Sequence, residues 1–320
     1  MTRRVRHVTR CRRNQFLLII DDDDMETLAT FPTELVTTIF VEGARMSTHL
    51  ACTLCLVARW TRALAMPYLY STIALETRQQ KTKLYETLSK GVLPVEGRGD
   101  FNPQEQIQNL WIESVSSHTV DLFKRSINLI RLAVPILSLM WIVHNSTPTV
   151  LFPPMLSKNS ITCRGDLDVL ILDDMIDLSG YAGSDPVARS PLFQKVKYLR
   201  LSTSLKPDQP ITLEPFCKLS HFAMPCRLTD ISPLTDSFKE ILDKPTITAF
   251  VLMIYSDETS QEERSAILEA FEKISMDYSV LQVLESDRGR LRQDWEIEAR
   301  GGESIWKKAE EYTSAIKRQG

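Results

Sequence analysis

Hydrophobic residues between positions 31 and 75 fall at helical spacing and predict three short amphipathic helices. Leu35, Ile39 and Phe40 lie on one side of the first helix, at i, i+4 and i+5. Pro32 suits the first helical position, where its missing N–H is no loss. A second apolar stripe continues at i, i+4, i+7 and i+14 through Leu50, Leu54, Val57 and Leu64. Because so short a unit buries too little surface to be stable alone, we expect it to dock on another structure.

A different hydrophobic pattern begins near residue 100. A six-residue pattern recurs there at intervals of 23 to 33 residues. It has apolar residues at its first, fourth and sixth positions, and the one at the fourth position is large. The seven copies are Ile107-x-x-Leu110-x-Ile112, Val134-x-x-Leu137-x-Leu139, Leu167-x-x-Leu170-x-Leu172, Val196-x-x-Leu199-x-Leu201, Leu219-x-x-Phe222-x-Met224, Ile247-x-x-Phe250-x-Leu252 and Tyr278-x-x-Leu281-x-Val283. The last three positions of each copy alternate as in a β-strand. The interval is close to that of leucine-rich repeats, though longer and less regular.

Helical spacing returns between these predicted strands. One apolar face is formed by Val120, Phe123, Ile127 and Ile130, and another by Leu234, Phe238, Ile241 and Leu242. Ser260 and Glu263 form a capping box ahead of a third helix. Strands alternating with helices predict an α/β fold of parallel strands with helices on one face. The specific expectation is a three-helix module followed by an irregular leucine-rich-repeat-like strand/helix array, and the alternative is a less regular α/β sheet.

The pattern divides the chain into four parts. Residues 1–26 hold six arginines, with no acidic residue before a run of aspartates at 21–24. This composition is typical of a disordered charged tail. A mitochondrial presequence and a nuclear import patch are the alternatives. Residues 27–78 form the helical module and residues 79–286 the repeat-like α/β domain. In 287–320 we expect two capping helices that are separated by a break at Gly301-Gly302 and cover the last strand.

Composition narrows the class of protein. A hydrophobic content of 43%, a charged content of 25% and a net charge of -3 are those of an ordinary globular chain, without the basic surface that nucleic acids or anionic membranes attract. No apolar run is long enough to span a bilayer. Six scattered cysteines favour a reducing compartment, cytoplasmic or nuclear. Cys52 and Cys55 lack the partners of a zinc site and are expected to be small buried hydrophobes.

Familiar catalytic motifs are absent from the sequence. It has no Gly-x-Ser-x-Gly, no phosphate-binding Gly-x-x-x-x-Gly-Lys-Ser/Thr and no His-Glu-x-x-His. Asp173, Asp174 and Asp177 follow a predicted strand and are more typical of solvated loop acids than of a cation site. We therefore expect no enzymatic activity, no cofactor and no metal.

The helical module resembles the F-box of the type abundant in mushroom-forming fungi (basidiomycetes). The family pattern is Leu-Pro-x-Glu-Leu, then Ile-Phe, then Leu-x-x-Val-x-x-x-Trp, then Pro-x-Leu-Tyr. The chain matches it at Pro32, Glu34, Leu35, Ile39, Phe40, Leu54, Val57, Trp60, Pro67, Leu69 and Tyr70. It departs at Phe31, where Leu is usual, and at Ala58, where Cys or Ser is common. The match covers about an eighth of the chain.

The resemblance implies a substrate receptor of an SCF (Skp-cullin-F-box) ubiquitin ligase. Its F-box would bind the Skp-family adaptor in a helix-in-groove interface, and the rest of the chain would capture an unknown protein substrate. The expected adaptor-binding residues are Pro32, Leu35, Ile39, Phe40, Val57 and Trp60. Two Pro- or Gly-containing loops, 145–164 and 179–191, are candidates for substrate contacts. Alternatives are a non-ligase interaction scaffold whose first helices cap the solenoid, a helical hairpin packed in the protein's own core, and a hydrolase or other enzyme on an α/β sheet.

Overall fold

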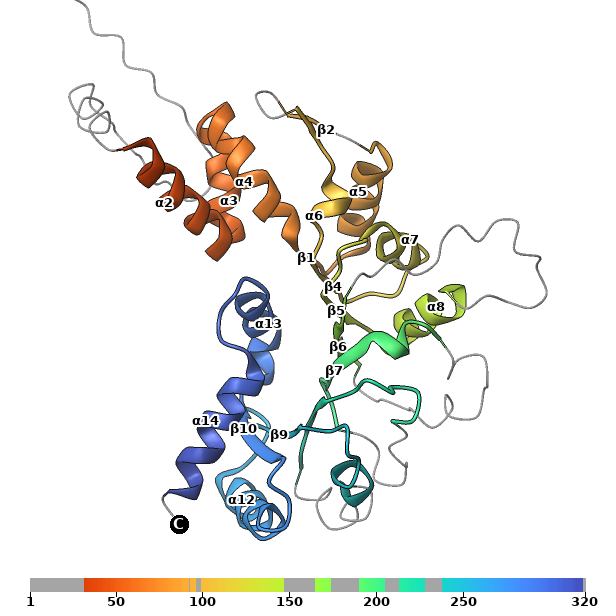
Figure 1. Ribbon diagram of the computed structural model, residues 1–320, viewed down its shortest axis with the longest axis vertical. Helices are drawn as coiled ribbons and strands as arrows, with labels where there is room; N and C mark the ends of the chain where they lie inside the picture. The colour runs from red at the N-terminus through yellow and green to blue at the C-terminus, as the bar shows by residue number, and fades with distance from the viewer. Residues whose placement is uncertain are drawn as a thin grey trace, which may run out of the picture.

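The fold is built around one eight-stranded sheet (Figure 1). The computed structural model describes residues 32–91, 93–95, 99–146, 165–173, 190–204, 213–227 and 238–318. Strand order along the sheet follows chain order, β1-β4-β5-β6-β7-β8-β9-β10, and each neighbouring pair is parallel. The prediction of an α/β fold with parallel strands is therefore confirmed. The charged segment 1–26 lies outside the described residues.

The strands of the sheet are short and mostly apolar. They are β1 (Thr72–Leu75), β4 (Asn109–Ile112), β5 (Arg131–Val134), β6 (Leu167–Ile171), β7 (Val196–Leu201), β8 (His221–Pro225), β9 (Ala249–Tyr255) and β10 (Leu281–Ser286). One residue from each strand lies in a single register row, and all eight are apolar: Ile73, Leu110, Leu132, Val169, Leu199, Phe222, Phe250 and Leu281. This row runs through the hydrophobic core from one end of the sheet to the other. A separate antiparallel pair joins β2 (Leu93–Val95) to β3 (Gly99–Phe101).

Helices cover the face of the sheet that carries this row, which we call the core face. They are α5 (Arg78–Ser89), α7 (His118–Arg125), α8 (Ile136–Ser146), α12 (Gln261–Ser275) and a short helix over 238–242. Two shorter elements, α6 (Pro103–Gln106) and the 3₁₀ turn η2 (Phe193–Lys195), lie before β4 and β7. The Ser260 hydroxyl accepts a hydrogen bond from Glu263 N at 3.2 Å, so α12 begins where the predicted capping box places it.

The opposite face, which we call the second face, is covered by the C-terminal helices (Figure 1). The chain passes through η3 (Arg288–Arg290) into α13 (Leu291–Ala299), turns at Gly301, whose φ is 93°, and continues as α14 (Ile305–Lys317). Trp295 of α13 packs on β4, β5 and β6, and Ala309 of α14 packs on β8, β9 and β10. Thr313 Oγ1 accepts from Val283 N at 2.9 Å and donates to Val283 O at 3.2 Å. Both backbone polar groups of Val283, on the edge strand β10, therefore have a hydrogen-bond partner.

The expectation that residues 287–320 only cover the last strand was therefore incomplete. The helix break at Gly301-Gly302 lies where the sequence predicts it, but α13 extends across the second face as far as β4. The physical reason is that this face carries apolar side chains that need a cover of their own, among them Trp111, Ala133 and Leu170. Helices thus lie on both faces of the sheet and not on one.

Two of the seven predicted strand triplets were wrong in register. The triplet at Val134 was assigned to a strand, but Val134 ends β5 and Leu137 lies in α8. The triplet at Leu167 assigns Leu170 to the core face, whereas Leu167, Val169 and Ile171 alternate on that face and Leu170 lies against Trp295 on the second face. The spacing is permissive, because Leu129, Leu132 and Val134 satisfy it equally well and are the buried set. In the other five triplets the defining residues belong to the core or pack against it.

The amino-terminal helices form a three-helix module at the β1 end of the sheet, drawn in red and orange in Figure 1. They are α2 (Thr33–Met46), α3 (Thr48–Val57) and α4 (Arg59–Ser71). Helix α4 runs directly into β1, so the first strand of the sheet falls inside the segment 27–78 that the sequence assigned to helices. The strand β1 was not predicted, because its four residues are too few to establish an alternating pattern.

Candidate functional site

The three-helix module has a small core of its own. Ala44, Ala51 and Ala65, one from each helix, are fully buried against one another. Larger side chains complete the cluster from α3 and α4: Leu54, Cys55, Tyr68 and Leu69. Because alanine lets helix axes approach closely but buries little area, this core leaves the larger apolar side chains of the module at its surface.

Thr61 fixes the corner between α3 and α4. Its hydroxyl donates to Leu54 O at 2.6 Å and accepts from Ala58 N at 3.0 Å, and the residue is fully buried. Arg62 Nε adds a bond to Cys55 O at 2.9 Å. The chain is extended at Ala58, so α3 and α4 are separate helices and the predicted stripe from Leu50 to Leu64 does not share one face. The corner determines how Val57, at the end of α3, lies relative to Trp60, at the start of α4.

The six residues predicted to bind a partner all belong to this module and are exposed or partly exposed. Ile39 is 62% exposed, Val57 64%, Leu35 51% and Trp60 50%. Phe40 is half-buried, and its ring stacks on Trp60 with the centroids 5.4 Å apart and the planes at 27°. Pro32 is exposed and lies one position earlier than predicted, at the N-cap of α2, where its carbonyl accepts from Leu35 N at 2.9 Å. None of these six side chains is sealed beneath the sheet.

The predicted adaptor-binding set leaves out three other exposed apolar residues of the module, one of which is Leu50 at 46% exposure. Met46, at the end of α2, is 74% exposed, and Leu56, near the end of α3, is 80% exposed. The signal was present, because Met46 follows Ile39 by seven residues and α3 is apolar around most of its circumference. The prediction that Cys52 is buried was wrong, since only one side of so apolar a helix can face inward. Cys55 is partly buried, and this burial raises the pKa of its thiol.

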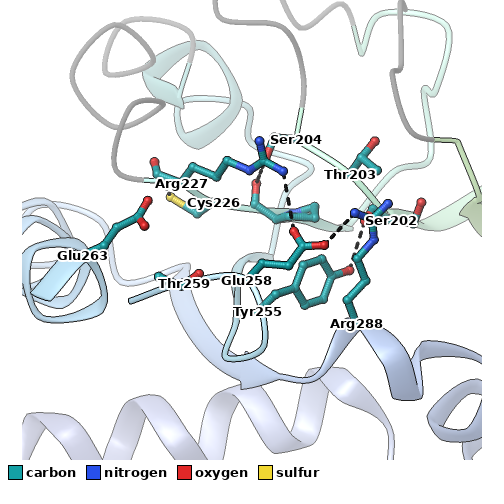
Figure 2. A pocket seen from close by; sticks show the side chains of 11 residues that line it. Ser202, Thr203, Ser204, Cys226, Arg227, Tyr255, Glu258, Thr259, Glu263 and Arg288 are labelled. Carbon is teal, nitrogen blue, oxygen red and sulfur yellow. Dashed lines mark hydrogen bonds and ion pairs between the residues drawn. The ribbon is translucent and has the colours of Figure 1, made fainter. Parts of the chain in front are cut away.

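A pocket of about 490 Å³ lies toward the other end of the sheet, at the carboxyl edge of β7, β8 and β9 (Figure 2). Hydroxyl groups line much of it, from Ser202, Thr203, Ser204, Tyr255 and Thr259. Carboxyl edges of parallel sheets commonly carry binding sites, because the loops there converge while the strands hold them in place.

Two guanidinium groups share one carboxylate in this pocket. Glu258 accepts from Arg288 at 2.7 Å and pairs with Arg227 at 3.5 Å, as the dashed lines in Figure 2 mark. Asp257 holds the backbone of the Arg288 turn, accepting from Arg288 N at 3.0 Å and from Gly289 N at 3.3 Å. These backbone bonds lower the pKa of Asp257. The turn that presents Arg288 is therefore fixed before any ligand arrives.

Tyr255 lines the pocket and is itself buried. Its hydroxyl donates to Ser202 O at 3.2 Å, and burial raises the pKa of this phenol well above its usual range. No histidine is found among the described residues that line the pocket. The arrangement offers charged and hydroxyl groups for binding a polar segment of another molecule.

The remaining predicted sites are described only in part. Asp173 is described, and its carboxylate accepts from Ile136 N at the start of α8, whereas Asp174 and Asp177 lie outside the described residues. Most of the two predicted substrate loops, 145–164 and 179–191, also lies outside them, at 147–164 and 179–189. Among the residues that the structure does describe, no group of three or more His, Cys, Asp or Glu side chains could hold a metal ion.

Comparison of the chain with protein-family models, with curated proteins and with solved structures found no match. Within the described ranges, none of the helices combines the length and the hydropathy needed to cross a bilayer. The function of the chain is therefore inferred from the geometry of the module and of the pocket.

Proposed function

We propose that this chain is an F-box-type substrate receptor, which links a target protein to an SCF ubiquitin ligase. In this proposal the three-helix module binds the Skp-family adaptor, and the sheet with its carboxyl-edge loops, an irregular leucine-rich-repeat-like array, captures the substrate. The chain acts by binding two proteins and performs no chemistry itself.

The observation that carries the proposal is the exposure of Leu35, Ile39, Val57 and Trp60 on one small helical module. Exposed apolar and aromatic side chains that cluster on a folded surface are typical of protein interfaces. Trp60 has the character of an interface hot spot, because an aromatic ring is large, rigid and held by its stack on Phe40. These positions are also those at which the sequence resembles the F-box pattern.

The helices that cover both faces of the sheet support the assignment of substrate capture to its carboxyl edge. The core face is covered by α5, α7, α8 and α12, and the second face by α13 and α14. The carboxyl edge carries the pocket with the Arg227, Glu258 and Arg288 cluster. We therefore place substrate capture at this edge rather than on either face. The consecutive strand order is typical of a solenoid, and solenoids commonly present an extended surface to a partner.

The alternative is a non-ligase scaffold whose first helices cap the solenoid. One observation favours it: α4 continues into β1, and Tyr70 at its end packs on Phe101 with ring centroids 5.6 Å apart. A cap, however, would bury its apolar residues against the array, whereas Ile39 and Val57 are mostly exposed. This exposure is why we favour the receptor.

The test is a binding measurement with the full-length chain and a Skp-family adaptor from a mushroom-forming fungus. We expect a one-to-one complex by size-exclusion chromatography and titration calorimetry, and loss of that complex in Ile39→Asp. Leu137→Asp is the matched control, because Leu137 is similarly exposed but lies on α8. Circular dichroism verifies that both variants are folded. If the folded wild-type chain forms no complex at protein concentrations of about 10 µM, a dissociation constant in the low micromolar range or below is excluded. The scaffold is then favoured.

A further inference from the structure

Helix α13 contacts the interior of the sheet with a buried aromatic pair. Trp295 is 1% exposed and meets Trp111 of β4 edge-to-face, with ring centroids 5.4 Å apart and planes at 61°. Ala133 of β5 and Leu170 of β6 complete the contact. A buried indole in such a setting is costly to displace, so the middle of α13 is anchored on the sheet.

A buried ion network anchors the next turn of α13. Glu298 Oε2 accepts from Arg200 of β7 at 2.9 Å, and Arg200 also donates to Asp168 of β6 at 3.0 Å. All three side chains are at least nine-tenths buried. A shift of α13 away from β6 and β7 would leave Arg200 buried without one of its two carboxylate partners, which is costly.

The end of α13 lies at the junction between the module and the sheet. The Asn109 side-chain amide, buried at the start of β4, has three acceptors within reach of its two hydrogens. They are Ser71 O at 3.3 Å, Thr72 Oγ1 at 3.0 Å and Ala299 O at 3.2 Å. Ser71 ends α4, Thr72 begins β1 and Ala299 ends α13. One side chain thus ties the last residue of the module to the end of α13.

The residue after α13 reaches the module itself. The Arg300 guanidinium donates to the carbonyl of Arg45, the penultimate residue of α2, at 3.2 Å, and to Thr48 Oγ1 at the start of α3. Gly301 follows with φ of 93°, and a Cβ there would lie 2.9 Å from the Arg45 guanidinium. The left-handed glycine therefore gives Arg300 its close approach to the corner between α2 and α3. In Figure 1 α13 lies directly below the module.

We propose that α13 is a strut that fixes the orientation of the three-helix module relative to the sheet, with Arg300 and Asn109 as positioning residues. Without α13, the module would be held to the sheet by the chain crossing from α4 into β1 and by the packing of Tyr70 on Phe101. The strut rests on the proposed function for its biological meaning: a receptor must hold its substrate at a set distance and angle from the adaptor. The contacts themselves do not depend on that function.

Hydrogen–deuterium exchange of the full-length chain tests the strut directly. We expect Arg300→Ala to speed exchange about ten-fold in residues 44–50 and 297–303, because local opening at the corner becomes easier. Exchange in β7 and β9 should stay as in the wild type. Arg300→Lys should be intermediate, since an ammonium retains the charge but not the planar fork. Arg290→Ala is the matched control, because Arg290 is an exposed arginine of η3 whose side chain, among the described contacts, pairs with Asp294 one turn away.

Small-angle scattering and a reconstituted ligase give the second measurement. Arg300→Ala should broaden the distribution of maximum dimensions while adaptor affinity stays within about two-fold, since Arg300 lies outside the proposed interface. Self-ubiquitination should spread over more lysines in the variant than in the wild type. Unchanged exchange at 44–50, or faster exchange in every strand, would overturn the strut. Failure of the wild-type chain to bind the adaptor would instead overturn the proposed function. The exchange measurement would then still decide whether α13 acts as a strut.

Discussion

The ring of Phe40 stacks on the indole of Trp60, with centroids 5.4 Å apart, although half of the Trp60 side chain faces solvent. The stack joins α2 to α4 and holds the exposed aromatic in one orientation. A side chain fixed in this way loses little conformational entropy when a partner covers it.

Trp60→Ala should therefore weaken adaptor binding more than any other single truncation on the module. We expect a loss of about 2 kcal/mol or more, which is roughly a thirty-fold weaker dissociation constant. Titration calorimetry measures it. Trp141→Ala is the control, because Trp141 is an exposed tryptophan on α8, away from the module. Equal affinities for wild type and Trp60→Ala would remove Trp60 from the interface.

Thr61→Val should destabilise the module without changing its shape. Valine fills the same volume but cannot donate to Leu54 O or accept from Ala58 N, so two backbone groups at the corner lose their partner. We expect a cost of about 1–2 kcal/mol, measured by exchange protection over residues 54–62. Thr53→Val removes an exposed hydroxyl that bonds to His49 O within α3, and it should leave protection unchanged. Comparable losses of protection in both variants would show that the Thr61 hydrogen bonds stabilise the module no more than the exposed Thr53 hydrogen bond does.

Glu298→Ala should be strongly destabilising, because it leaves Arg200 buried with one of its two carboxylate partners missing. Breaking a buried ion pair from one side typically costs about 3–5 kcal/mol, to be measured as the free energy of unfolding in urea. Glu269→Ala breaks an exposed pair with Lys273 on α12 and should produce no measurable change. A small effect of Glu298→Ala would indicate that water replaces the lost carboxylate and that α13 is held mainly by Trp295.

His221 should make the protein less stable in mild acid. Burial lowers the pKa of this imidazole, and Lys197 on β7 adds to the effect while Asp168 on β6 opposes it. The unfolded chain, whose histidine titrates near its ordinary value of about 6.5, then binds the proton more readily than the folded chain. The stabilisation is therefore complete above that value and is lost as the pH falls through the lower pKa of the folded state.

His221→Phe tests this pH dependence. Phenylalanine keeps a ring against Tyr198 and Trp306 but cannot take up a proton. The difference between wild type and variant should change between about pH 7 and pH 5 with a slope of at most about 1.4 kcal/mol per pH unit. Urea unfolding at several pH values measures the slope. Parallel stability curves for the two proteins would contradict the assignment to His221.

Local pattern predicted the helices that carry the candidate site. Periodicity placed Leu35, Ile39 and Phe40 on one helix, and the structure adds that Ile39 is largely exposed while Phe40 is half-buried. Sequence alone could not distinguish these states, because the small alanine core that leaves larger residues outside forms only when three helices meet. The pocket with Arg227 and Arg288 was not predicted at all, since its residues come from separate strand ends and no local spacing connects them.

The sequence by itself determined the class of fold, the amphipathic helices and the glycine break before α14, because each of these follows from spacing between near neighbours along the chain. Only the tertiary structure decided that α13 crosses the second face and that Asn109 meets Ala299, 190 residues away. A hydrophobic pattern states which side chains must leave water. It does not state which distant segment will cover them, because that choice depends on shape, charge and register across the whole assembled sheet.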